Sequence, residues 1–141
     1  MEDTDLVSII AEKQRMIRRT CQSMWGKVHD LHISETEWAV LRLALESTVT
    51  ISEAAKCLEI TRQASHKVVR SMEEKGLVSV HESEVYKNRK YIIPSETGRM
   101  YAKEQEQMKN SLVEKIEQTI GSENAQRMKE LLSMDWGLEY E

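Results

Sequence analysis

The chain has 141 residues, of which 40% are hydrophobic and 31% charged, a balance that is ordinary for a folded domain and excludes wholesale disorder. Its five glycines, one proline and two cysteines exclude a disulfide framework and disfavour a parallel α/β enzyme, which needs more glycine for turns and phosphate loops. The net charge is −4, yet residues 62–103 carry +4, so a basic stretch lies inside an acidic protein.

Residues 6–31 carry apolar side chains at spacings of three and four, which predicts one long amphipathic helix. The chain starts with neither a basic nor an apolar leader, and its longest apolar run covers only residues 38–41. We therefore expect no secretion signal and no membrane partner, and we expect the protein to be cytoplasmic.

Capping boxes predict where the next helices begin. Ser34 and Glu37 have the required spacing, and Thr50 and Glu53 repeat it. After a three-residue turn, Thr61 is expected to cap a helix over residues 62–75.

The second half of the chain predicts a hairpin and two further helices. Gly76 is expected to end the helix before it. Residues 78–82 and 89–93 are β-prone and predict a hairpin. Ser95 and Ser122 are expected to cap a long helix and a last one. This order predicts a mainly α fold with a small β-hairpin: a winged helix-turn-helix flanked by long terminal helices.

The helix over residues 62–75 has an apolar face and an opposite face rich in cations and hydrogen-bond donors. Such side chains reach base edges and phosphates in a DNA groove. The cations of the hairpin would reach a minor groove or flanking phosphates. The expected DNA contacts are Arg62, Gln63, Ser65, His66, Lys67, Arg70, Lys87, Arg89 and Lys90.

Three features of the chain point to one family: residues 50–58 and 72–78, the order of the elements, and the Ser-Glu-Thr-Gly run at 95–98. In these features the chain resembles the MarR family of bacterial transcription regulators. The resemblance implies a homodimeric repressor on pseudo-palindromic double-stranded DNA, relieved by a small-molecule effector, and not an enzyme. It implies dimerisation helices in residues 1–33 and 99–141 and a DNA-binding region in residues 34–98, within one compact domain.

The chain departs from the family pattern in the hairpin, at Pro94-Ser95, where the family often has Leu-Thr, and in the turn before residue 62. Tyr86 and Asn88 stand where the family usually carries an Asp-x-Arg pair, so the wing arginine is lost or shifted to Arg89. Glu59 replaces the usual turn glycine.

Other chemistry has weaker support. Candidates for a ligand pocket are Met16, Trp25, Trp38 and Met108, although core and dimer packing is the default for such residues.

Cys21 is the candidate for redox sensing, and His29 with His32 for metal sensing. We favour a small hydrophobic role for Cys21, and for Cys57 a place in the core. For the histidines we favour interfacial or solvated polar roles, so no metal and no cofactor are expected. The remaining alternative is a winged-helix protein-interaction module that does not bind DNA.

Overall fold

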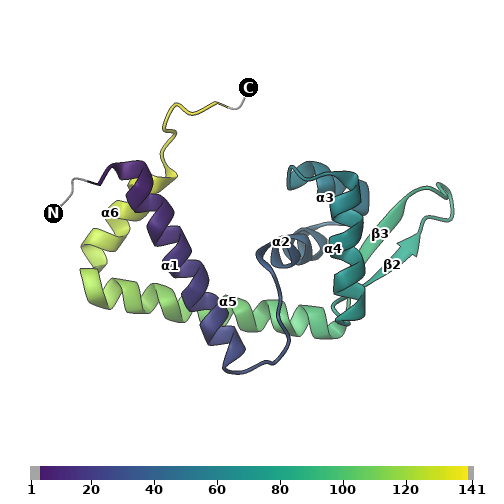
Figure 1. Cartoon of the computed structure of the whole chain (residues 1–141), viewed down its shortest axis with the longest axis horizontal. Coiled ribbons are helices and arrows are strands. Elements are labelled where there is room, and N and C mark those ends of the chain that lie inside the picture. Colours follow the sequence, from purple (N-terminus) through teal and green to yellow (C-terminus); the bar gives the residue numbers. More distant parts are fainter. Residues whose placement is uncertain (1–3, 140–141) are drawn as a thin grey trace. The chain divides into compact units, whose positions relative to one another are not determined.

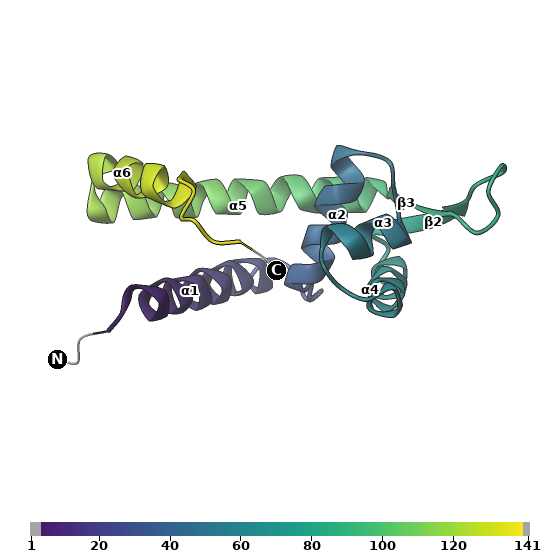
Figure 2. The same ribbon diagram turned by 90° about the horizontal axis from the view of Figure 1, so that it is seen from above.

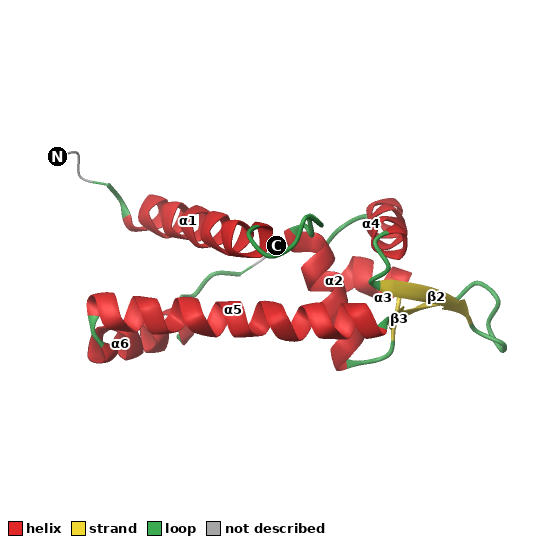
Figure 3. Cartoon of the chain, turned by 90° about the horizontal axis from the view of Figure 1, so that it is seen from below, coloured by secondary structure: helices red, strands yellow, loops and turns green. Residues whose placement is uncertain are grey.

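The computed structural model describes residues 4–139 and confirms the predicted fold class. It is mainly helical, with six helices and one three-stranded antiparallel sheet in the described part (Figures 1 and 3). The chain divides into two compact units. The first ends at Glu106 and the second begins at Gln107. No helix within residues 4–139 is long and apolar enough to cross a membrane.

The elements follow the predicted order. The first unit contains α1 (Leu6–Gly26), α2 (Glu35–Glu46), β1 (Val49–Thr50), α3 (Ile51–Cys57), α4 (Arg62–Glu74), β2 (Val78–Glu82), β3 (Lys90–Pro94) and the first part of α5 (Glu96–Ile120). The second unit contains the rest of α5 and α6 (Ser122–Ser133).

Most helices begin where the sequence predicts. Ser34 and Glu37 form a complete capping box, each side chain accepting the other residue's backbone N–H at 3.2 and 2.9 Å. The hydroxyls of Thr50, Thr61 and Ser95 each accept a backbone N–H from three residues further on. These local bonds satisfy helix-end donors, so they are readable from the sequence.

Two cap predictions need correction. Glu53 accepts a hydrogen bond from the Thr50 hydroxyl at 3.1 Å, so this capping box is only half formed. The prediction that Ser122 caps the last helix is wrong, because Gly121 occupies the N-cap with a φ of 92° and makes no side-chain cap bond.

The end of α4 is a Schellman motif, as predicted. Gly76 has a φ of 74°, which favours glycine, and its N–H donates to Glu73 O at 3.0 Å. Leu77 N donates to Met72 O at 3.0 Å, and both of these side chains are fully buried. The chain therefore turns from α4 into β2 with its helix-end carbonyls satisfied.

The sheet contains a strand that the sequence did not reveal. Its order is β1-β3-β2, and the two-residue β1 pairs Val49 with Ile92 and Thr50 with Tyr91. A strand of two residues is too short to show the alternation of apolar and polar side chains by which a strand is predicted.

The core of the first unit lies between α2, α4 and the sheet. Its largest fully buried apolar side chains come from each of these elements and from the turn after α4: Leu41, Met72, Leu77, Ile92, Val40 and Val69. Figure 2 shows α3 beside α4, with the β2–β3 hairpin extending beyond them. The packed core thus fixes α4 with one face inward and the other free.

Candidate nucleic-acid interface

The free face of α4 carries the side chains that the helical pattern placed there. Arg62, Gln63, Lys67 and Arg70 are exposed, and His66 is half-buried. The opposite face enters the core. The first half of α4 therefore presents cations and hydrogen-bond donors to the outside without any acid among them.

Ser65 is the exception, and its prediction as a DNA contact is wrong. Its side chain is fully buried, and Ser65 Oγ donates to Ile51 O at 2.8 Å. A helix turns about 100° per residue, so Ser65 lies between the buried Met72 and Val69 around the axis. The position of Ser65 around the helix can be read from the sequence alone, so its burial could have been predicted. The hydroxyl holds α4 against α3.

The hairpin tip is a short, hydrogen-bonded loop. Ser83 Oγ accepts from Tyr86 N at 3.1 Å, and Arg89 N donates to Tyr86 O at 2.9 Å. The guanidinium carbon of Arg89 lies 4.4 Å from the centre of the Tyr86 ring, a cation–π contact. Lys87 and Lys90 are exposed on the same hairpin. The tip thus holds Arg89 in a defined position.

One open depression joins α4 to the hairpin. Arg62 and His66 contribute from α4, and Arg89 and Lys90 from the hairpin. The predicted contacts Gln63, Lys67, Arg70 and Lys87 lie outside it, on exposed surface. The full lining is Thr50, Ile51, Ser52, Glu53, Lys56, Arg62, His66, Asn88, Arg89 and Lys90.

The charge of this depression favours an anion. Four cationic side chains line it against one carboxylate, that of Glu53. Lys56 was not anticipated from the sequence, because it lies on α3 and only the tertiary fold brings it beside α4. The arrangement suits a surface that meets a row of phosphates.

The residues predicted to line a ligand pocket are only partly brought together. Trp25 and Trp38 are buried and meet edge to face, with ring centres 5.1 Å apart. Met16 precedes Trp25 by nine residues on α1, which places it about 180° away around the helix, and it is exposed. Within one chain, Met16 and Trp25 therefore lie on opposite sides of α1. Met108 is half-buried in the second unit.

The two histidines have different surroundings. His29 stacks on Trp25 with centres 4.0 Å apart, and its Nε2 lies 2.8 Å from Glu104 Oε2. His32 is exposed. Within residues 4–139, no group of three or more His, Cys, Asp and Glu side chains could hold a metal ion, so the metal-sensing alternative gains no support.

The cysteines lie on separate helices. Cys21 is half-buried on α1. Cys57, expected in the core, is exposed at the end of α3, so that expectation is wrong. Ala54 and Ala55 fill the buried face of α3, whereas Cys57, the last residue of this short helix, lies outside that face.

This fold and surface define a winged-helix protein with a cationic face. The family model described as MarR family matches residues 30–85, from the α1–α2 connection into the hairpin. The resemblance inferred from the sequence is thereby confirmed, and the chain has the winged-helix fold of MarR-family transcription regulators. The comparison with curated proteins found no match.

Solved structures share this fold across almost the whole chain. A single-residue mutant of Staphylococcus aureus MepR has a TM-score of 0.76 at 15% identity, with 92% of this chain and 95% of that chain covered. A mutant of MarR from E. coli also has a TM-score of 0.76, at 16% identity, with 94% and 96% covered. An S. aureus MepR–DNA complex has a TM-score of 0.73 at 14% identity, with 93% and 95% covered.

Proposed function

We propose that this protein is a sequence-specific, double-stranded DNA-binding transcription regulator and not an enzyme. The observation that carries the proposal is that Arg62 and His66 of α4 line the same depression as Arg89 and Lys90 of the hairpin. A helix flanked by a cationic hairpin can enter a major groove while the hairpin meets the adjacent backbone. The similarity to a MepR–DNA complex supports the same use of the fold.

In this proposal α4 is the recognition helix and the hairpin is the wing. Arg62, Gln63 and Arg70 carry donors that match base edges in the major groove. Lys67 and Lys87 supply charge to the phosphates. Because Arg89 is held over Tyr86, it is our candidate for the wing arginine that the sequence pattern left in doubt.

We further propose a homodimer built by the terminal helices, with residues 34–98 as the DNA-binding region between them. No residue of α6 is buried within the chain. Contiguous exposed apolar residues mark an interaction surface, and a two-fold pair of winged helices suits a pseudo-palindromic site. The exposed apolar side chains are Leu6, Val7, Ile9, Met16 and Ile17 on α1, and Val113, Ile120, Met128, Leu131, Leu132, Met134, Trp136 and Leu138 in the second unit.

The regulator is proposed to repress in the bacterial cytoplasm and to release DNA when a small molecule binds. The support for these points is the MarR-family match. The dimer would block access to the DNA that it covers. An effector would act by binding better to a state whose two recognition helices no longer fit the half-sites.

Selection of bound duplexes from a random DNA pool, followed by a salt titration, tests the proposal. We expect enrichment of a two-fold related sequence and a log K that falls with log salt at a slope of about −4 or steeper, because each phosphate contact contributes about −0.9. Failure to enrich any sequence, together with no binding at low salt, would contradict the DNA-binding role.

A further inference from the structure

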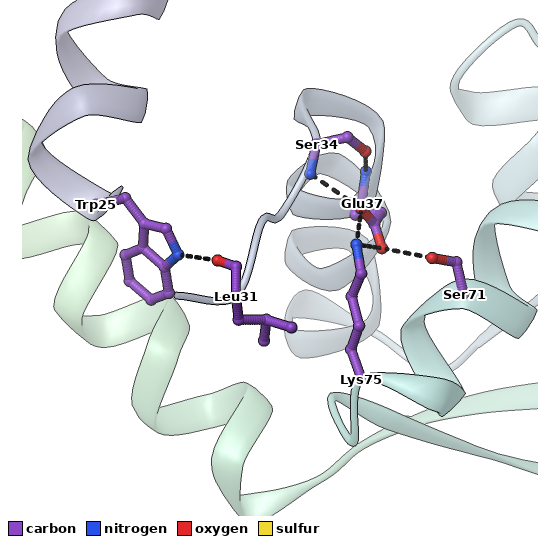
Figure 4. A network of polar contacts seen from close by, with 6 residues as sticks. All are labelled: Trp25, Leu31, Ser34, Glu37, Ser71 and Lys75. Atoms are coloured by element: carbon purple, nitrogen blue, oxygen red, sulfur yellow. Dashed lines mark hydrogen bonds and ion pairs between the residues drawn. The ribbon is translucent and has the colours of Figure 1, made fainter. Parts of the chain in front are cut away.

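Glu37 is a buried carboxylate with four polar contacts. It is only 3% exposed and lies in the first turn of α2. Its oxygens accept hydrogen bonds from Ser34 N at 2.9 Å, from Lys75 Nζ at 2.7 and 2.9 Å, and from Ser71 Oγ at 3.2 Å (Figure 4). A buried carboxylate is costly unless such partners surround it.

These contacts join the beginning of α2 to the end of α4. Ser71 lies in α4 and Lys75 is its C-cap residue, whereas Glu37 belongs to the capping box that starts α2. Near the opposite end of α4, Ser65 Oγ donates to Ile51 O of α3. The helix is thus held by directional polar bonds near both ends.

Holding both ends matters for a helix that reads DNA. A helix of 13 residues is about 20 Å long, so a tilt of about 5° at one end moves the other end by about 2 Å. That displacement exceeds the tolerance of about 0.5 Å for a well-placed recognition group. Apolar packing is less directional than hydrogen bonding, so the polar bonds near both ends add a constraint on the tilt of α4 to the one that the core supplies.

Stability by itself gives a weak reason for this arrangement. A buried ion pair often adds little net stability compared with apolar residues of the same volume, because desolvation offsets the attraction. Its directional bonds do fix the distance and rotation of the two helices that carry it. The polar cluster therefore suits a positioning role.

We propose that Glu37 is a positioning residue for the recognition helix, acting through Lys75 and Ser71 to fix the orientation at which α4 presents its cations. This inference rests on the proposed DNA-binding function. It adds a determinant of specificity that contacts no DNA itself.

The test compares Glu37→Gln with wild type in the full chain, at a temperature where circular dichroism shows both to be folded. Affinity is measured for a duplex selected by the wild-type protein and for an unrelated duplex. We expect the variant to lose about tenfold on the selected duplex and less than twofold on the unrelated one, because phosphate contacts tolerate a small tilt better than base contacts.

Hydrogen exchange supplies a readout independent of DNA. Amides of residues 71–77 should exchange at least tenfold faster in Glu37→Gln, whereas those of α3 should not change. Lys75→Arg, which keeps the ion pair, should retain most of the affinity and protection.

If Glu37→Gln fails to fold, Ser71→Ala removes one contact without leaving a charge unpaired and should lower the affinity for the selected duplex about threefold.

Val49→Ala is the matched control, because it destabilises the same unit from a buried position in β1. It should leave the preference for the selected duplex unchanged. An equal loss of preference in this control, or a Glu37→Gln affinity within twofold of wild type, would overturn the positioning role alone. A wild-type chain without any preferred duplex would overturn the proposed function, and the positioning role with it.

Discussion

The backbone of Gly98 lies against the carbonyl oxygen of Leu77, and a Cβ at position 98 would overlap that oxygen. The same carbonyl accepts from Ser95 N at 2.9 Å, and Ser95 Oγ donates to Gly76 O at 2.6 Å. The start of α5 is therefore docked on the turn that ends α4. This close approach is possible only because residue 98 lacks a side chain.

Gly98→Ala is expected to lower the free energy of unfolding by about 3 kcal/mol, because the added methyl group meets rigid backbone. Urea unfolding followed by circular dichroism measures the change. Gly26→Ala is the control: its Cβ would meet nothing within 4 Å, and the variant should be as stable as wild type or slightly more so. Equal stability of the two variants would contradict the docking of α5.

Replacement of Arg62 or Arg70 by alanine should weaken binding to a selected duplex by about 1–3 kcal/mol for each lost base contact, with the fold unchanged. Arg42→Ala removes the same charge from an exposed position on α2 outside the depression and should have little effect. Fluorescence anisotropy with labelled duplex measures the affinities. If both α4 variants bind as wild type does, the assignment of α4 as recognition helix is wrong.

The contact between the wing and DNA can be tested by the salt dependence of the binding constant. Arg89→Ala should reduce the steepness of log K against log salt by about one unit, because one phosphate contact is lost. Tyr86→Phe keeps the ring that supports Arg89 and should bind nearly as wild type does, whereas Tyr86→Ala should approach the Arg89→Ala affinity. Salt slopes that do not change in Arg89→Ala would exclude the wing from the interface.

Acid should weaken the fold through Glu37. Burial raises the pKa of this carboxyl, but the hydrogen bonds from Lys75 and Ser34 outweigh burial and leave the pKa below its ordinary value of 4.5. The unfolded chain then binds the proton more readily, so the contribution of Glu37 to stability is complete above about pH 4.5 and is lost as the pH falls through the lower, folded value.

Urea unfolding of wild type and Glu37→Gln from pH 7 to pH 3 measures this contribution. The variant should be less stable at pH 7, and the difference should shrink as the pH falls below about 4.5. Lys75→Arg should keep the wild-type pH profile, because the carboxylate retains its cationic partner. A difference that is constant across this range would contradict the charged state of Glu37 in the fold.

Dimerisation is tested on the exposed apolar face of α6. Leu131→Glu or Leu132→Glu should shift the protein from dimer to monomer in sedimentation at micromolar concentration, because a charge would be buried in the interface. Gln118→Glu makes the same change of charge at an exposed position of α5 and should leave the assembly intact. A monomeric wild-type protein would overturn the dimer proposal directly.

The sequence by itself determined the helices, the β2–β3 hairpin and the outward face of α4. Caps such as those of Ser34 and Thr61 act within three residues, and the helix stop at Gly76 depends on a local backbone angle. The alternation of apolar and polar residues around a helix is equally local. For this reason, the winged helix-turn-helix could be predicted from the sequence alone.

Only the tertiary structure decided which side chains meet across the chain. Glu37 and Lys75 are 38 residues apart, and no local pattern pairs them. Lys56 reaches the depression beside Arg62 because α3 packs against α4, and the two-residue β1 exists because β3 lies beside it. Such contacts depend on how the elements pack, and local propensity carries no information about that packing.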